Sequence, residues 1–75
     1  MYNTRRKALD RAYRLLEEAM NIVEQAQEEE QEAYDNLPEG IQESERGYQL
    51  SENADALYDV YTDIENIMEN LVEVI

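Results

Sequence analysis

NLPEGIQESERG, residues 36–47, is the stretch of the chain that decides the fold, since it separates two long segments of helical pattern. Pro38 lacks an amide hydrogen and disfavours helical geometry at Leu37, so the first helix is predicted to end near Asn36. The pair Pro38–Glu39 could also open a single short helical turn, because proline suits the first helical position and glutamate suits the positive helix end.

On both sides of this stretch, seam residues recur at alternating steps of four and three, which is the spacing of a coiled coil. They are Leu9, Tyr13, Leu16, Met20, Val23, Gln27, Glu30, Tyr34 and Leu37 before the turn, and Leu50, Ala54, Leu57, Tyr61, Ile64, Met68, Leu71 and Ile75 after it. A connection this short makes the helices antiparallel neighbours. We therefore predict an all-α fold, a coiled-coil-like two-helix hairpin forming a single domain over residues 1–75. Its helices are expected at about 3–36 and 48–74, with the turn at about 37–47.

The start of the second helix has two candidate caps, Ser44 and Ser51. Gly47 would weaken a first turn that contained it, so the sequence leaves the start open between these serines. Folding the chain about residues 43 and 44 brings Gln27 level with Tyr61. A polar side chain in a dry seam is costly, so the Tyr61 hydroxyl is the expected partner of Gln27.

In the same register Ile75 lies opposite Tyr13, and the basic segment from Tyr2 to Arg11 overhangs the end of the second helix. Beside the first seam a column of alanines recurs every seven residues, and its counterpart on the second helix is mostly branched. The two columns are Ala12, Ala19, Ala26 and Ala33, and Asn53, Val60, Ile67 and Val74. Small residues facing branched ones would let the backbones approach closely, although alanine is also simply a good helix former.

The apolar surface is wider than one hairpin can cover, because Leu15, Ile22 and Val72 lie outside the seam. A core this small favours self-association, so we expect a homo-oligomer, a dimer forming a helical bundle. The predicted oligomer interface consists of Leu9, Leu15, Leu16, Ile22, Leu71, Val72 and Ile75.

The composition argues against an enzyme. The 75 residues include no His and no Cys, which removes the commonest general base and any thiolate nucleophile or zinc-thiolate site. No glycine-rich phosphate loop is present. We predict no catalytic, cofactor-binding or metal-ligating residue. Asp55, Asp59 and Asp63 share one helix face, but a straight helix cannot wrap six oxygen ligands around one ion, so weak cation condensation is the favoured interpretation.

The formal net charge of −13 is distributed unevenly along the chain. Residues 1–14 carry +4, with a basic tip formed by Arg5, Arg6, Lys7, Arg11 and Arg14, and residues 15–75 carry −17. The acidic part predicts a partner protein with a basic surface and opposes direct nucleic-acid binding. The tip is expected to pair with the acidic second helix of a neighbouring protomer or with the C-terminal carboxylate at Ile75, rather than with phosphate or a membrane.

Carboxylates four residues apart on a helix are about 6 Å apart along its axis, comparable to the step between phosphates of a nucleic-acid strand. The predicted acidic partner-binding face comprises Glu28, Glu32, Asp35, Glu52, Asp55, Asp59 and Asp63. Such a rod could occupy a groove built for DNA or RNA. Acidity for solubility alone is the competing explanation.

The stretch from Glu28 to Gly47 resembles the signature of small acidic helical-hairpin proteins of phages and mobile elements of Gram-positive bacteria. The matching residues are Asp35, Asn36, Leu37, Pro38, Glu39, Gln42, Ser44, Glu45 and Arg46. Most members of that group have no assigned function. The basic start is not part of the signature. The resemblance implies a phage or mobile-element context, and by analogy an inhibitor of host defence of the anti-CRISPR or anti-restriction kind.

Two functions therefore remain open. The first is a non-enzymatic inhibitor that occupies a basic nucleic-acid-binding surface of a host defence protein, and the alternative is a structural or assembly hairpin whose oligomer interface is its function. No apolar run is long enough for a signal peptide or a membrane span, and an interfacial helix would want Trp or Phe. We expect a cytoplasmic protein of a bacterial host cell, with no membrane partner.

Overall fold

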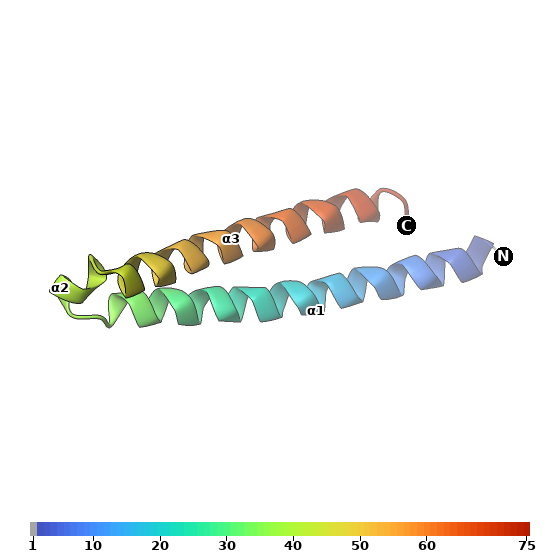
Figure 1. Ribbon diagram of the computed structural model, residues 1–75. Coiled ribbons are helices and arrows are strands. Elements are labelled where there is room, and N and C mark those ends of the chain that lie inside the picture. Colours follow the sequence, from blue (N-terminus) through green and yellow to red (C-terminus); the bar gives the residue numbers. More distant parts are fainter. Residues whose placement is uncertain (1) are drawn as a thin grey trace.

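The protein is a helical hairpin in which two long helices lie side by side (Figure 1). The computed structural model describes residues 2–75 and contains no strand among them. Helices α1 (Tyr2–Asp35) and α3 (Glu45–Val72) are joined through a short helix, α2 (Glu39–Gln42). The Cα atoms extend over 60 × 15 × 12 Å. The predicted all-α class and the packing of the two long helices against each other are confirmed.

The turn between the long helices contains the short helix that the sequence left as an alternative. Pro38 has φ −56° and ψ 147°, an extended geometry that ends α1 and places the residue as the N-cap of α2. The Gln42 side-chain amide donates a hydrogen bond to the carbonyl oxygen of Tyr34 at 3.2 Å. The same oxygen accepts a hydrogen bond from the Leu37 amide at 3.1 Å, so Gln42 adds a second bond to a carbonyl that Pro38, which has no amide hydrogen, cannot bond.

Helix α3 begins at Glu45, earlier than the predicted start at about residue 48. Ser44 is its N-cap, and the Ser44 hydroxyl oxygen accepts a hydrogen bond from the Gly47 amide at 3.4 Å. Gly47 lies buried in the first turn, where a Cβ would overlap the carbonyl group of Gln42. The helix therefore starts at the serine nearer the turn, and its first turn contains the glycine because no larger residue fits there.

The seam residues of each long helix are covered only by the other long helix, as expected for two helices alone. Ala54 and Met68 are buried, with 1% and 6% of their surfaces exposed. Most other seam residues are half-buried: Leu9, Tyr13, Leu16, Met20, Val23, Gln27, Glu30, Tyr34, Leu37, Leu50, Leu57, Tyr61, Ile64 and Leu71. The register agrees with the expected one, because Tyr13 and Ile75 line one pocket and Gln27 and Tyr61 line another.

The hairpin has two broad faces, one on each side of the plane through both long helices. These faces, called flanks below, differ in character. Antiparallel helices are related by a twofold axis perpendicular to the hairpin's broad faces, so residues of equal helical phase lie on the same flank. Three of the alanines beside the seam are half-buried, whereas Ala33 is exposed. The branched column opposite them stays exposed, at 43%, 51% and 54% for Val60, Ile67 and Val74, because nothing covers this flank. No helix in residues 2–75 has the length and apolar character needed to cross a membrane.

Candidate functional site

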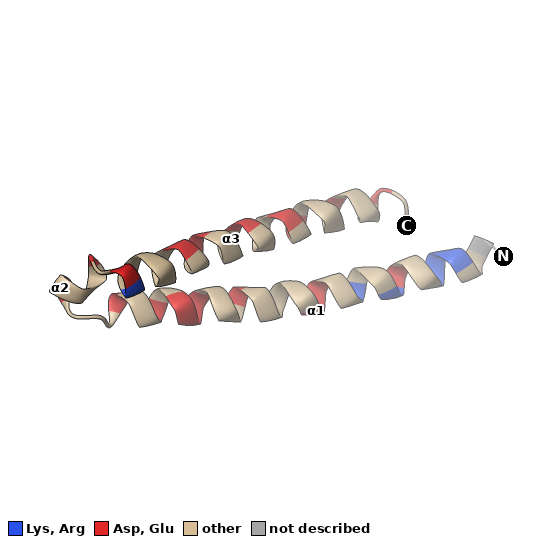
Figure 2. Cartoon of the chain, in the orientation of Figure 1, with Lys and Arg blue, Asp and Glu red and all other residues tan. Residues whose placement is uncertain are grey.

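Acidic residues lie along both long helices, and basic residues gather at the start of α1 (Figure 2). All seven residues of the predicted acidic face are exposed: Glu28, Glu32 and Asp35 on α1, and Glu52, Asp55, Asp59 and Asp63 on α3. None of them belongs to the seam, so the two groups point outward from different helices. The structure thus distributes the predicted acidic face over two edges of one rod.

The density of charge along the rod is close to that of a nucleic-acid strand. Helix α3 is about 42 Å long at 1.5 Å per residue. Over this length α3 and the facing part of α1, residues 16–35, carry fifteen acidic residues and one basic residue. That is about one net negative charge per 3 Å. A single strand carries one per ~3.4 Å of axis, and a duplex one per ~1.7 Å.

These carboxylates are not neutralised within the hairpin. Arg14 donates to Asp10 at 3.1 Å, four residues away at the exposed start of α1. Within residues 2–75, no carboxylate after Asp10 forms an ion pair with a basic side chain. Asp35, Glu29 and Glu30 accept hydrogen bonds from Gln31, Gln25 and Asn53, but these donors are neutral. A cationic partner can therefore reach the carboxylates without first breaking an internal ion pair.

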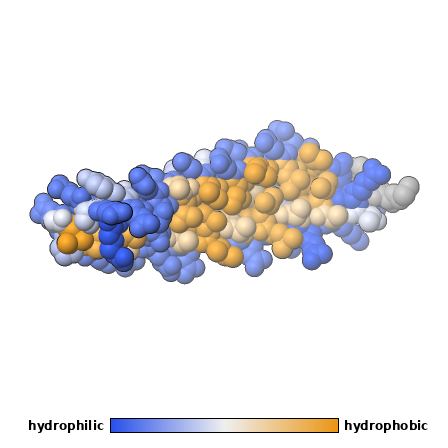
Figure 3. Space-filling model, in the orientation of Figure 1, coloured by the Kyte–Doolittle hydropathy of each residue, from blue (hydrophilic) through white to orange (hydrophobic). Residues whose placement is uncertain are grey.

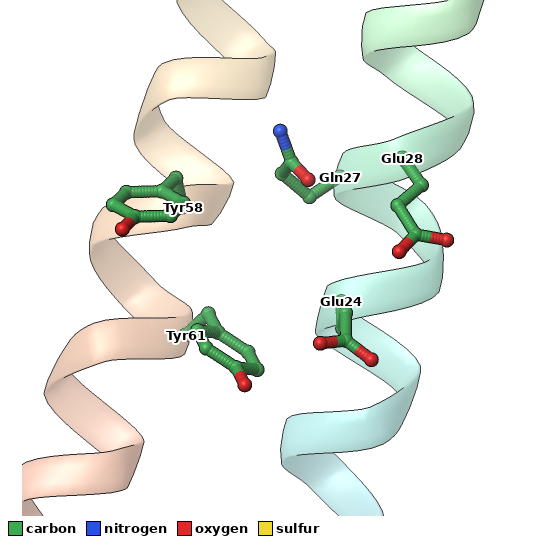
Figure 4. Close-up of a pocket in the computed structure, with 5 residues that line it drawn as sticks. All are labelled: Glu24, Gln27, Glu28, Tyr58 and Tyr61. Atoms are coloured by element: carbon green, nitrogen blue, oxygen red, sulfur yellow. The ribbon is translucent and has the colours of Figure 1, made fainter.

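A pocket of about 90 Å³ lies between α1 and α3 near the middle of the rod (Figure 4). It is lined by Glu24, Gln27 and Glu28 of α1 and by Tyr58 and Tyr61 of α3. The negative charge of Glu24 raises the pKa of the Tyr61 hydroxyl above its ordinary value of 10.0. Four smaller effects raise the pKa of Tyr61 further: partial burial, the charge of Glu65, hydrogen bonding with Glu24, and the neighbouring Tyr58.

The partner of the Tyr61 hydroxyl in this pocket differs from the one expected in the seam. Gln27 and Tyr61 do lie together, but the side chain that acts most strongly on the Tyr61 hydroxyl is Glu24. Sequence reasoning missed Glu24 and Tyr58 as pocket residues. Each lies four residues after a seam position, at Met20 and Ala54. Because Glu24 and Tyr58 have the same helical phase on antiparallel helices, they lie on the same flank. Their spacing from the seam could therefore have predicted that they are neighbours.

The first part of the basic tip, Arg5 to Lys7, lies where α1 extends past the end of α3 (Figure 2), and Arg11 and Arg14 lie near the level of the last turn of α3. Arg6 is half-buried, and the other four members, Arg5, Lys7, Arg11 and Arg14, are exposed. At this end a second pocket is lined by Asp10, Tyr13, Val72 and Ile75. In residues 2–75 no group of three or more Asp or Glu side chains is placed to hold a metal ion.

The residues of the predicted oligomer interface do not form one surface. Leu9, Leu16 and Leu71 are half-buried in the seam. Val72 and Ile75 line the pocket with Asp10, on the same flank as Glu24 and Tyr58. Leu15 and Ile22 are 54% and 62% exposed and, by helical phase, lie on the opposite flank, beside the alanines.

Comparison of the chain with models of protein families, with curated proteins and with solved structures gives no match.

Proposed function

We propose that the hairpin is a non-enzymatic binding module whose acidic helices occupy a basic nucleic-acid-binding surface of another protein and so keep nucleic acid out. The observation that carries the proposal is the linear charge density of about one net negative charge per 3 Å, close to that of a single strand. The resemblance to phage and mobile-element hairpins favours a host defence protein as the target, in the manner of anti-CRISPR or anti-restriction inhibitors.

The rigidity of the rod supports this function. The carboxylates stand on two packed helices, so binding need not order a flexible chain first. A row such as Asp55, Asp59 and Asp63 presents charges at steps of about 6 Å. Complementary charge also accelerates association and makes it sensitive to salt.

The pocket between the helices offers a place for one cationic side chain of the partner. Two tyrosine rings, Tyr58 and Tyr61, stand beside two carboxylates, Glu24 and Glu28 (Figure 4). An arginine guanidinium interacts favourably with an aromatic face and donates charge-assisted hydrogen bonds to carboxylates. We assign this pocket the role of anchoring one arginine of the basic surface.

A competition measurement tests the proposed function. Purified restriction enzymes and CRISPR effectors are loaded with a fluorescent oligonucleotide, and fluorescence anisotropy follows its release as the hairpin is added. We expect release by at least one of them, weakening steeply as salt is raised. The absence of competition across the panel at low salt would remove the support for mimicry.

The alternative function, a structural or assembly hairpin, is favoured by a different observation. Large apolar side chains stay exposed on the flank that carries the alanines, and apolar side chains gather across both helices on the face shown in Figure 3. Contiguous exposed apolar surface commonly marks an interaction site. The structural or assembly function predicts a stable oligomer whose activity does not depend on the acidic residues.

A further inference from the structure

One row of α1 on the exposed apolar flank has an unusual order. Taken at alternating steps of three and four, it is Arg5, Ala8, Ala12, Leu15, Ala19, Ile22, Ala26 and Glu29. These positions share one strip of the helix because their spacing averages the helical period. Leu15 and Ile22, at its centre, are 54% and 62% exposed. Nothing within the hairpin covers them.

The row is complementary to itself when it is reversed. With a second copy turned end for end about the level of residue 17, Leu15 meets Ala19 and Ile22 meets Ala12. Ala8 then meets Ala26, and Arg5 meets Glu29. Each large side chain faces a small one, and the charged ends face opposite charges. Large-to-small matching permits close helix packing, and opposite charges at the rim fix the orientation.

We propose that this row is the interface of a symmetric dimer in which α1 of one copy packs antiparallel on α1 of the other. Helix α3 can contribute to the same contact. The Tyr13–Ile75 register places Val74 near the level of residue 14 and Ile67 near that of residue 21. Those levels are also symmetric about residue 17 to within one residue, so the two copies bring Val74 against Ile67.

Charge selects a second copy in this orientation. The antiparallel arrangement sets residues 5–14, which carry the basic tip, beside residues 20–29 of the other copy. That segment holds Glu24, Glu28 and Glu29 and no basic residue. Of the three, only Glu29 lies on the row, opposite Arg5; Glu24 and Glu28 line the pocket on the opposite flank and act over a longer distance. A parallel arrangement would instead bring two basic tips together, which like-charge repulsion opposes. Asp55 and Asp59 lie on the other side of α3 by helical phase and stay exposed in the dimer.

The dimer does not depend on the proposed function, since either one can fail while the other holds. Sedimentation equilibrium of Ile22→Lys tests the interface, and Val72→Lys is the matched control because Val72 is 55% exposed on the opposite flank. We expect Ile22→Lys to raise the dimer dissociation constant roughly 100-fold, since the symmetry places a lysine in the contact twice. Val72→Lys should leave it unchanged. A monomeric wild-type protein at micromolar concentration, or equal behaviour of the two variants, would overturn the proposal.

Cysteine cross-linking tests the orientation and leaves the large apolar residues of the row, Leu15 and Ile22, unchanged. The chain has no cysteine, so Ala8→Cys and Ala26→Cys each introduce a single thiol. An equimolar mixture should form the mixed disulfide dimer on oxidation. Either variant alone should not, because its two thiols would stand about 27 Å apart. Cross-linking of each variant with itself would establish a parallel arrangement, and no cross-link in the mixture would show that the row is not the contact.

Discussion

Gly47 and Gly40 are the two glycines of the chain, and they have different surroundings. A Cβ at Gly47 would overlap the backbone of Gln42, whereas a Cβ at Gly40 would meet nothing within 4 Å. The close approach at Gly47 lets α3 begin directly after α2. The sequence could show only that both glycines lie in the turn. Which one is needed depends on how α2 packs, which no local pattern indicates.

Replacing these glycines one at a time separates the two cases. Gly47→Ala should lower the free energy of unfolding by about 2 kcal/mol, because backbone rather than a movable side chain occupies the space. Gly40→Ala should raise it by roughly 0.5 kcal/mol, since alanine reduces the conformational entropy of the unfolded chain. Thermal unfolding followed by circular dichroism measures both. Similar effects of the two substitutions would contradict the described turn.

Tyr61 makes stability depend on pH in the alkaline range. Its pKa is raised in the folded state, first by the charge of Glu24, so the folded protein holds this proton more tightly than the unfolded chain. The associated stabilisation is fully present below pH 10, the ordinary tyrosine pKa, and is lost as pH rises through the folded pKa. Denaturant unfolding of the wild-type protein at pH values on both sides of 10 should show this loss.

Glu24→Gln serves as the test variant, because it removes the largest cause of the shift. Its tyrosine absorbance titration should move toward lower pH than that of the wild type. Tyr61→Phe identifies which of the six tyrosines accounts for the difference. A wild-type titration identical to that of Glu24→Gln would show that the two side chains do not interact.

At the scale of the helices, the sequence predicted most of what the structure shows. The alternating spacing located the seam and the register, because burial against one neighbour imposes that period. It did not determine where α3 begins, since Ser44 and Ser51 are equivalent as local signals. It also identified the exposed acidic residues but grouped them on one face. Their division between α1 and α3 follows from their positions before and after the turn.

Repulsion among the carboxylates should be measurable within α1. Glu28 lies four residues from both Glu24 and Glu32, and like charges at this spacing destabilise a helix. Glu28→Gln should therefore raise the free energy of unfolding by about 0.5 kcal/mol at low salt and by less at high salt. Glu18→Gln removes the same charge but lies four residues after Arg14, so it should bring no gain. Equal gains from the two variants would point to net charge rather than local pairs.

For the whole molecule, shape and charge separate the two kinds of contact that we propose. The acidic edges of the rod face outward along about 42 Å of paired helix, and the apolar flank lies between them on one broad face. A dimer formed through that flank leaves Asp55 and Asp59 on α3 free for a basic partner. The two contacts can therefore coexist, and variants of one surface should leave the other intact.

The most direct measurement of the central claim is oligonucleotide displacement by two charge-reversal variants of equal net charge. One carries Glu52→Lys, Asp55→Lys and Asp59→Lys, and the other carries three lysines outside the predicted face, at Glu17, Glu18 and Glu73. We predict that the first loses at least tenfold in its affinity for the basic partner, while the second competes nearly as well as the wild type at moderate salt. Equal competition by the two variants would contradict the account, because the acidic row of α3 would then be no more than a solvated surface.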